Sequence, residues 1–461
     1  MFEKKTYVQR RNQLKKRVGS GLIFFLGNKE SPMNYRANVY PFRQDSSFLY
    51  FFGLDSPELA AAIDVDENRE ILFGDDVGIE DIIWTGPQPR MKDRAAEVGV
   101  MEALALGKLD GVVKAALKKG RPVHFLPPYR ADISERIGEL TGMPAREVQS
   151  KSSEDLIRVV VDERSVKSDE EINEIEKALE ITYPMYIAAI KMAKPGRFEW
   201  QVTATMETVM RSLGGAFAFP PIVTINGHIF HNTFSGNVLK KGRMLVADCG
   251  AESSLHYACD ITRSIPVGGK FTRRQKDIYE IVLQAQLTAI AAMKPGIRFR
   301  DIHLKAARTI AGGLKDLKLM RGDSDAAVEK GAHALFFPHG LGHQLGLDVH
   351  DMESLGEAHV GYDAKIKRSK QFGLAYLRMA RELRPGHVMT VEPGVYFIPA
   401  LFDQWRKRRK HIDFINYDKV ETFLDFGGVR IEDNVLVVGK GRRVLGRPIP
   451  KTIEDIEKTA S

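Results

Sequence analysis

Three acidic side chains, Asp248, Glu392 and Glu432, lie in apolar, strand-like segments of the second half of the chain, and a fourth acid, Asp260, follows the first of them. Asp248 follows Met-Leu-Val-Ala and Glu392 follows Val-Met-Thr-Val, and a second acid comes after each, Asp260 in Asp-Ile-Thr-Arg and Glu432 in Arg-Ile-Glu-Asp. A buried carboxylate loses much of its solvation free energy unless a cation compensates it. The pattern therefore demands a positive partner, which is either an arginine in a structural ion pair or a metal ion.

A sequence repeat decides between these two partners. Residues 242–250 align with residues 386–394, and in both segments an acid stands six residues after the first glycine and two before the last. Arg263 and Arg430 lie near the acids in the sequence and are the arginines available for structural ion pairs. Independent ion pairs have no reason to repeat in register, so the two matched pairs of acids favour metal binding.

Histidines add to the acids. His339, His343 and His350 fall within twelve residues, with small glycines between them that allow close approach to a site. His231 occupies the corresponding place in the first half of the repeat. Four carboxylates and one imidazole make an oxygen-rich set of ligands, which suits manganese or cobalt better than the thiolate or multi-histidine sites typical of zinc and copper. Two shared carboxylates would hold two ions about 3.5 to 4 Å apart, an arrangement that activates water for hydrolysis.

The elements that must position these side chains begin after an N-terminal α/β domain. In the first third, β-rich runs alternate with helical patterns, which predicts an α/β domain. We expect strands at 21–27, 48–53, 60–66, 70–73 and 123–126, and a helix over 101–119. A charged stretch at 162–167 then leads to Ser168 and Glu171, which can form a capping box at a helix start. The predicted domains are therefore residues 1–165 and 166–461.

The second domain repeats a helix pair as well as the acid segments. A Lys-Pro-Gly turn at 194–196 recurs at 294–296, and the second occurrence follows a helix that Thr272 and Gln275 can cap. A β-rich block carrying two of the acids comes after each helix pair. The sequence thus predicts two similar α+β halves that together supply four carboxylates.

Five motifs in order resemble those of the pita-bread metallopeptidases that cleave Xaa-Pro bonds, aminopeptidase P and prolidase. The motifs are Asp248 with Asp260-Ile-Thr-Arg, Pro-His-Gly-Leu-Gly-His at 338–343, Val-His-Asp at 349–351, Thr-Val-Glu-Pro-Gly at 390–394 and Arg-Ile-Glu-Asp at 430–433. The resemblance covers nearly the whole chain, because residues 42–53 are similar to that family's N-terminal domain. It implies an α/β N-terminal domain and an α+β pita-bread (creatinase/aminopeptidase-like) catalytic domain with an internal pseudo-two-fold repeat.

The resemblance also implies a dinuclear metal centre. One ion is expected on Asp248, Asp260 and Glu432 are expected to bridge the two ions, and His343 with Glu392 are expected to hold the other. The ions implied are two divalent metals, with manganese expected and cobalt or zinc as alternatives. A homodimer is carried over by resemblance alone.

Roles in catalysis and substrate binding follow from the same resemblance. The expected catalytic residues are Glu392, His231, His339 and His350, and the expected substrate-binding residues are His231, His350, Arg378 and Arg430. Glu392 is expected to move a proton to the leaving imino nitrogen while a histidine such as His350 stabilises the oxyanion. The Xaa-Pro amide is tertiary and offers no N–H to an ordinary protease, which gives this activity its niche.

Arg378 bears on the choice between the two peptidase types. It matches an arginine that contacts the substrate carboxylate in prolidases, so we interpret the chain as an Xaa-Pro dipeptidase. The alternative is an Xaa-Pro aminopeptidase that acts on longer peptides with proline at the second position.

One spacing departs from the family pattern. Asp248 and Asp260 are twelve residues apart, whereas the family usually has eleven. One extra residue within a strand would turn every later side chain to the other face. We therefore expect the insertion in the turn around 252–254 or in a bulge.

The amino-acid composition excludes several classes of protein. Hydrophobic residues at 43% and charged residues at 28% are ordinary globular values, which exclude disordered, collagen-like and disulfide-scaffold proteins. The net charge of +8 permits acidic partners without requiring them. No apolar run is long enough to span a membrane and the first residues lead into a charged segment, so we expect a cytoplasmic protein without a membrane partner.

Two further features have structural interpretations. The basic run at 406–410 beside Trp405 is the best support for a non-catalytic module that binds protein or nucleic acid. We do not expect nucleic acid as a partner, because all five metal-ligand positions of the family pattern are occupied. Cys249 and Cys259 are too few for a disulfide framework, and we expect both to be small buried side chains.

Overall fold

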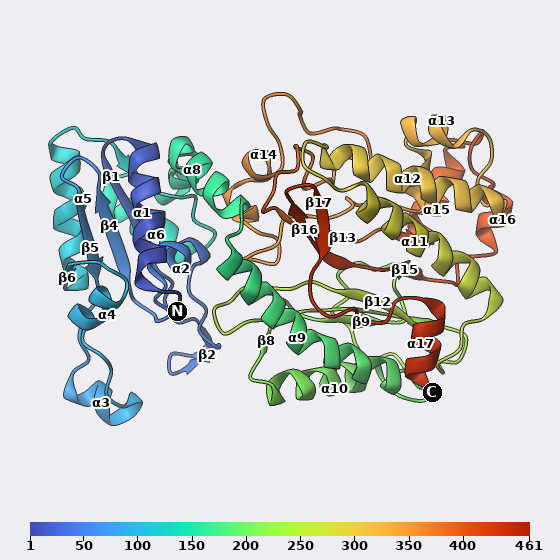
Figure 1. Ribbon diagram of the computed structural model, residues 1–461, viewed down its shortest axis with the longest axis horizontal. Coiled ribbons are helices and arrows are strands. Elements are labelled where there is room, and N and C mark those ends of the chain that lie inside the picture. Colours follow the sequence, from blue (N-terminus) through green and yellow to red (C-terminus); the bar gives the residue numbers. More distant parts are fainter. The chain divides into compact units, whose positions relative to one another are not determined.

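The computed structural model describes all 461 residues, which form two compact units (Figure 1). Unit 1 consists of Met1–Arg164 and Ser354–His359, and unit 2 consists of Ser165–Glu353 and Val360–Ser461. The chain leaves unit 1 at the end of helix α8 (Glu154–Ser165). That helix ends inside the charged stretch that precedes the Ser168 cap.

Unit 1 is built on a mixed five-stranded sheet in the order β6-β5-β4-β1-β7. Its strands are β1 Leu22–Leu26, β4 Ala60–Asp64, β5 Arg69–Phe73, β6 Glu102–Leu104 and β7 Val123–His124. A second ribbon pairs β2 (Pro32–Tyr35) with β3 (Asn38–Val39). The helices are α1 Lys4–Val18, α2 Ser46–Phe52, α3 Ile79–Thr85, α4 Met91–Glu97, α5 Leu109–Lys118, α6 Ala131–Thr141 and α7 Ala145–Lys151. One sheet face packs on α5, α6 and α7, and Phe25 on the other face contacts Phe51 and Phe52 of α2.

Two expected elements of unit 1 are wrong. Residues 48–53, expected as a strand, lie in helix α2, whose side chains are all buried. The Asp45 side chain caps this helix by accepting from the Phe48 N–H, and Gly53 ends it in the left-handed conformation. Because the run is apolar on every side, its periodicity could not distinguish a strand from a buried helix. The expected helix over 101–119 begins only at Leu109, since residues 102–104 pair with β5 as strand β6.

Unit 2 contains two helix pairs and several short antiparallel sheets. Its strands are β8 Ala216–Phe217, β9 Ile222–Thr224, β10 Met244–Asp248, β11 Ala251–Glu252, β12 Thr262–Pro266, β13 Val388–Val391, β14 Gly394–Tyr396, β15 Gly428–Arg430, β16 Asp433–Val438 and β17 Gly441–Val444. Its helices are α9 Asp169–Met192, α10 Glu199–Ser212, α11 Arg273–Ala292, α12 Phe299–Asp316, α13 Ser324–Glu329, α15 Pro399–Lys407, α16 Tyr417–Glu421 and α17 Ile453–Ala460, with α14 Glu357–Val360 at the boundary of the two units. No helix of the chain has the length and apolar character needed to cross a membrane.

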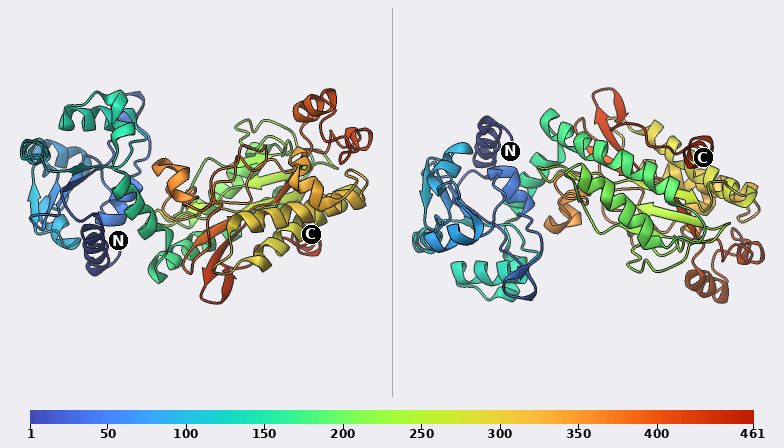
Figure 2. Two further views of the ribbon diagram at one scale, coloured as in Figure 1. Left: turned by 90° about the horizontal axis from the view of Figure 1, so that it is seen from above. Right: turned by 90° about the horizontal axis from the view of Figure 1, so that it is seen from below.

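The two helix pairs confirm the repeat within unit 2. Figure 1 shows α9 with α10 and α11 with α12 as two packed pairs, and the view from below in Figure 2 brings the α9–α10 pair to the front. Both expected capping boxes are formed, at Ser168 and at Thr272. The turns between the helices are equivalent, because Gly196 and Gly296 have φ angles of 86° and 84°. Such positive φ angles are readily adopted only by glycine.

A seam of strands joins the two halves and carries the acids. Strands β10 and β12 form one antiparallel hairpin, and β13 pairs antiparallel with β16. Across the seam, Thr262 and Glu432 form an isolated antiparallel bridge, and the Ser264 hydroxyl exchanges two hydrogen bonds of 3.0 Å with the Arg430 backbone. The ends of strands from both halves therefore meet at one place.

Candidate metal centre

The first pair of acids lies on one face of the β10–β12 hairpin. Asp248 lies directly opposite Thr262, and Asp260 precedes Thr262 by two residues, so both carboxylates project from the same side of the ladder. The hydrogen bonds from Cys249 N to Ile261 O and from Cys259 N to Ala251 O continue the same register. No bulge interrupts the ladder between the two acids.

The paired part of this hairpin ends at a short loop. Ser253 N donates to Tyr257 O at 2.9 Å, so the ladder keeps its register up to the loop at 254–256. His256 closes the loop with a φ of 64°, and its ring bonds to Glu252 at 2.8 Å. The loop thus lies at 254–256 rather than at the expected 252–254, no bulge precedes it, and the carboxylates keep their common face. The insertion relative to the family stays a prediction.

The second pair of acids is held by the other half. Glu432 N donates to Thr262 O, which places Glu432 beside the first hairpin. Two residues on, the Asn434 side chain donates to Asp260 O and accepts from Asp260 N, so the amide substitutes for a missing strand partner. Val391 pairs with Asp433, and the same register sets Glu392 opposite Glu432.

His343 reaches the acids from a segment that runs beside β13. The backbone of residues 341–345 bonds to β13 through Thr390 N to His343 O and Glu392 N to Leu341 O. A Cβ atom at Gly342 would lie 2.1 Å from Thr390 O, so only glycine permits this close approach. The Thr390 hydroxyl accepts from His343 N at 3.0 Å and fixes the histidine backbone.

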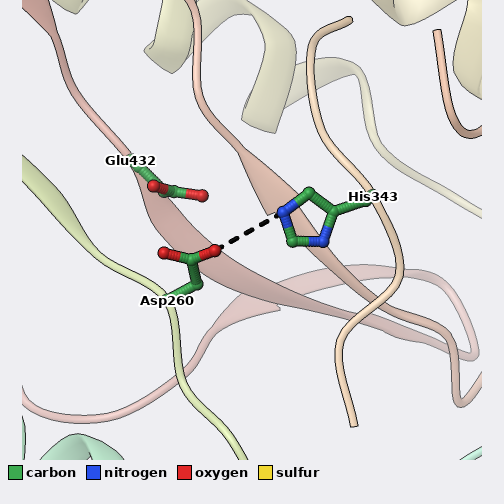
Figure 3. A group of neighbouring side chains, drawn as sticks. All are labelled: Asp260, His343 and Glu432. Atoms are coloured by element: carbon green, nitrogen blue, oxygen red, sulfur yellow. Dashed lines mark ion pairs between the residues drawn. The ribbon is translucent and has the colours of Figure 1, made fainter. Parts of the chain in front are cut away.

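Three of these side chains converge closely enough to share an ion. Asp260, His343 and Glu432 each offer a ligand atom within 4.8 Å of the others, and all three are buried (Figure 3). His343 Nε2 lies 3.4 Å from Asp260 Oδ2 and 3.7 Å from Glu392 Oε1. The group thus contains acids from both halves of the repeat and the imidazole.

The residues of this group fit a bound cation. Asp260 Oδ1 and Glu432 Oε1 are buried without a hydrogen-bond partner. His343 Nδ1 bonds to the carbonyl of Gln344 at 3.0 Å, which requires the proton on Nδ1 and leaves the Nε2 lone pair facing carboxylates. Lone pairs directed at one another repel unless a cation lies between them.

The electrostatics of the site point the same way. Burial raises the pKa of Asp260 to about 8 and of Glu392 to about 8, and it raises the pKa of Glu432 well above the ordinary value. Burial also lowers the pKa of His343 to about 4, so the imidazole is neutral. A metal ion would supply the charge that keeps these acids ionised.

Asp248 has a different partner in this arrangement. Arg430 Nη2 donates to Asp248 Oδ2, Nε donates to the Thr262 hydroxyl at 3.1 Å, and Nη1 donates to the Tyr396 hydroxyl at 3.1 Å. The Thr262 hydroxyl in turn donates to Glu432 Oε2 at 2.8 Å. Arg430 and Thr262 therefore link Asp248 of the first hairpin to Glu432 of the second half through one buried network.

The predicted histidines surround the metal centre in different ways. His339 bonds through Nδ1 to Gly340 O and through Nε2 to the Tyr396 hydroxyl, both at 2.8 Å, and burial lowers its pKa to about 3. The His350 ring lies 4.1 Å from that of His343, and its Nδ1 lies 2.5 Å from Glu353 Oε2. His231 is exposed on its own loop.

All ten residues predicted from the sequence line one cavity of about 980 Å³. Arg378 is among them, and its Nε lies 3.3 Å from Glu353 Oε2. Apolar side chains complete the lining, including Phe219, Pro220, Pro221, Phe230 and Phe372. Such a mixture of convergent polar groups and apolar walls is typical of a binding site for a small molecule or a peptide.

Sequence reasoning missed four residues that organise the site. Thr262 and Asn434 each lie two residues after a predicted ligand, Asp260 and Glu432, and so share its face of the strand. That period of two is a signal that could have found them. Tyr396, which bonds to His339 and Arg430, and Glu353, which bonds to His350 and Arg378, had no such signal.

Comparison with known proteins assigns both parts of the chain. Residues 173–438 match the metallopeptidase family M24, and residues 7–124 match the aminopeptidase P N-terminal domain. A protein of Aspergillus fumigatus named probable Xaa-Pro aminopeptidase is 31% identical over 453 residues, which cover 96% of this chain and 92% of the relative. Its counterpart in Aspergillus terreus is 33% identical over 454 residues, covering 95% and 93%.

Solved structures agree over the full length. Aminopeptidase PepP of Pseudomonas aeruginosa matches with a TM-score of 0.82 at 28% identity and covers 100% of this chain and 98% of its own. Zinc-substituted aminopeptidase P of Escherichia coli in complex with product matches equally well at 27% identity, with the same coverage. These matches confirm the expected α/β N-terminal domain and pita-bread catalytic domain. The chain therefore belongs to the metallopeptidase family M24 and, within it, to the Xaa-Pro aminopeptidase family.

Proposed function

We propose that this protein is an Xaa-Pro aminopeptidase that removes the first residue from peptides with proline at the second position. The observation that carries the proposal is the convergence of Asp260, His343 and Glu432 on the wall of a peptide-sized cavity. All three are buried, and each of the two acids has one oxygen without a hydrogen-bond partner. Relatives over the whole chain are named Xaa-Pro aminopeptidases, and one matching structure of aminopeptidase P is described as a complex with substrate.

Five residues are proposed to hold two divalent ions, with manganese as the expected metal. These ligands are Asp248, Asp260, His343, Glu392 and Glu432, and their oxygen-rich set suits a hard cation. When bound, the ions would polarise the scissile carbonyl and activate water for attack. Arg430 keeps Asp248 oriented toward the site through the network with Thr262 and Tyr396.

Glu392 is proposed to handle the proton of the reaction. A tertiary Xaa-Pro amide has no N–H, so the proline nitrogen must gain a proton when the bond breaks. The Glu392 carboxylate lies on the cavity wall opposite Glu432 and beside His343, where it can take a proton from the attacking water and pass it to that nitrogen.

His350 and His339 are proposed to act in different ways. Burial lowers the pKa of His350, and the Glu353 carboxylate at its Nδ1 opposes that shift. Glu353 thereby favours the imidazolium that is proposed to donate from Nε2 to the developing oxyanion. Both ring nitrogens of His339 are engaged within the chain, so it serves best as a support for Tyr396 and Arg430. His231, on its exposed loop at the cavity, is proposed to contact the substrate.

The dipeptidase interpretation is less well supported than its alternative. It rests on Arg378 as a reader of the substrate carboxylate, yet Arg378 already pairs with the chain's own Glu353. The cavity of about 980 Å³ is near the upper end of typical ligand pockets, which leaves room for residues beyond proline. The relatives are named aminopeptidases, which favours the same alternative.

A binding module for nucleic acid has little support from the basic run. Arg406 pairs with Asp418 at 3.3 Å and with Glu421 at 2.8 Å, and Lys410 Nζ lies 4.0 Å from the centroid of the Trp405 ring. Arg406 and Lys410, the two ends of the run, thus have partners within the chain, as is typical of a solvated structural segment.

The test compares peptides of increasing length. Manganese-loaded protein is incubated with an Xaa-Pro dipeptide, an Xaa-Pro tripeptide and an Xaa-Pro pentapeptide, and the released first residue is measured with and without a chelator. We expect chelator-sensitive cleavage that is faster for the longer peptides. N-terminal acetylation of the pentapeptide should abolish release. Cleavage confined to the dipeptide would restore the dipeptidase interpretation, and no cleavage of any peptide would refute the proposed function.

A further inference from the structure

A carboxylate of the chain itself lies against an arginine on the cavity wall. A short helix begins at Glu353, directly after Met352, where a left-handed φ of 64° reverses the chain. Glu353 N donates to His350 O at 3.1 Å, so the side chain folds back over the histidine that precedes the turn. Its Oε2 then contacts both His350 Nδ1, at 2.5 Å, and Arg378 Nε, at 3.3 Å.

Arg378 is held at this place by its backbone. The Tyr362 hydroxyl donates to Leu377 O at 2.6 Å, immediately before the arginine. A Cβ atom at Gly361 would lie 1.7 Å from Arg378 O, so the two segments are in direct contact. The backbone that carries this guanidinium is therefore held in place at the cavity wall.

The cavity contains only two strong cations among its lining side chains, Arg378 and Arg430. The Arg430 side chain is 5% exposed and committed to Asp248, Thr262 and Tyr396. The Arg378 side chain is 33% exposed, so it is the cation that a charged substrate group can approach. A guanidinium binds carboxylates with paired, charge-assisted hydrogen bonds.

We propose that Glu353 determines the length specificity of the enzyme by occupying Arg378 in place of the free carboxylate of an Xaa-Pro dipeptide. This inference rests on the proposed aminopeptidase function and names the residue that directs it toward longer peptides. Glu353 thus competes with the free carboxylate of a dipeptide for Arg378. That carboxylate is the group that distinguishes a dipeptide from the start of a longer peptide.

The proposed specificity has its physical basis in the charges of Arg378 and Glu353 beside the cavity. A dipeptide carboxylate that approaches Arg378 also meets the negative charge of Glu353, and repulsion between the two carboxylates offsets the attraction of the arginine. The proline carbonyl of a longer peptide belongs to a neutral amide and experiences no such repulsion. Glu353 therefore removes an advantage from dipeptides without weakening the binding of longer substrates.

The test changes one charge on the enzyme and one on the substrate. Glu353→Gln keeps the shape of the side chain and removes its charge. The paired substrates are an Xaa-Pro dipeptide and the same dipeptide with a C-terminal amide, which differ only in the carboxylate charge. We expect the ratio of kcat/KM for acid over amide to rise about tenfold or more in Glu353→Gln, which corresponds to about 1.4 kcal/mol.

Two control variants make the readout specific. The gain should disappear in the double variant Glu353→Gln with Arg378→Ala, because the arginine is the proposed partner of the substrate carboxylate. Glu180→Gln, an exposed acid on α9, should leave the ratio unchanged. A weaker His350 would slow both substrates alike, so it cancels in the ratio.

A binding measurement separates this inference from the proposed function. Calorimetric titration of the full chain with the dipeptide and with its amide should show the same shift toward the acid in Glu353→Gln. An unchanged ratio in both kinetics and binding, or a gain that survives Arg378→Ala, would overturn the inference. Failure of the wild-type enzyme to cleave any Xaa-Pro peptide, with the calorimetric shift still present, would instead refute the proposed function alone.

Discussion

Two neighbouring acids, Glu432 and Asp433, are both buried yet lie in opposite electrostatic surroundings. Asp433 accepts from Arg263 at 2.6 Å and from Lys451 at 2.5 Å, and these cations outweigh burial and lower its pKa. Glu432 accepts from the Thr262 hydroxyl, its Oε1 atom has no hydrogen-bond partner, and burial raises its pKa well above the ordinary value.

The pleat of the strand explains how both situations arise one residue apart. Successive side chains point to opposite faces, so one face holds a structural ion-pair cluster and the other faces the metal centre. The Asp433 side of the strand therefore carries ion pairs, as the first hypothesis drawn from the sequence expected, and the Glu432 side carries the candidate metal ligands of the second hypothesis. Burial of an acid is common to both, and only the count of cations around it distinguishes them.

The largest expected effect is on activity, and it comes from a substitution among the candidate metal ligands. Asp260→Asn should lower bound manganese and reduce activity by about 10³-fold or more, because Asp260 is a proposed ligand and a neutral amide binds a divalent cation more weakly than a carboxylate does. Circular dichroism should still report a folded protein. Full activity or full metal content in this variant would contradict the dinuclear model.

A substitution of Asp433, which removes its ion pairs, should lower the free energy of unfolding instead of the activity. Asp433→Asn leaves Arg263 and Lys451 without their buried counter-charge, which typically destabilises a protein by about 3 to 5 kcal/mol. Denaturant unfolding should show this loss while manganese content per folded molecule is retained. The control is Asp425→Asn, whose exposed pair with Arg274 should contribute less than about 1 kcal/mol. Equal losses in both variants would remove the distinction.

The histidines offer a smaller and separate test. His339→Ala and His350→Ala should each lower turnover by about 10²-fold, because His350 is proposed to stabilise the oxyanion and His339 to support Tyr396 and Arg430. Metal content should be largely kept, because neither is a proposed ligand. Loss of manganese from both variants would show that they belong to the ligand set.

The smallest expected effect is a gain in the stability of the metal-free protein when an acid of the candidate metal centre is neutralised. Asp260 has a pKa raised from 3.8 to about 8, so it contributes stability below pH 4 that is lost as the pH rises through about 8. Asp260→Asn should therefore raise the melting temperature of the metal-free protein at pH 8, by an amount equivalent to about 1 to 2 kcal/mol. Asp433→Asn should lower it under the same conditions. A metal-free wild type whose stability does not fall between pH 4 and 8 would contradict this account.

Much of the candidate site could be predicted because its residues stand in short motifs with a strand period. Asp248, Asp260, Glu392 and Glu432 could be found from their apolar flanks and from the repeat. Glu353 could not, because its place over His350 depends on the backbone angle of Met352. The helix at 46–52 could not be predicted from periodicity, because it is buried on all sides and has no polar face to alternate with its apolar face. The metal, the individual catalytic roles and the homodimer remain predictions.

The turn at residues 254–256 has a consequence for recognising related chains from their sequences. The antiparallel register from Asp248 to Ser253 fixes the face on which both acids lie, and residues added at the tip leave that face unchanged. A search pattern with a fixed interval between the two acids would reject this chain although its ladder is intact. Patterns for such hairpins should therefore constrain the residues on the paired strands and let the number of loop residues vary.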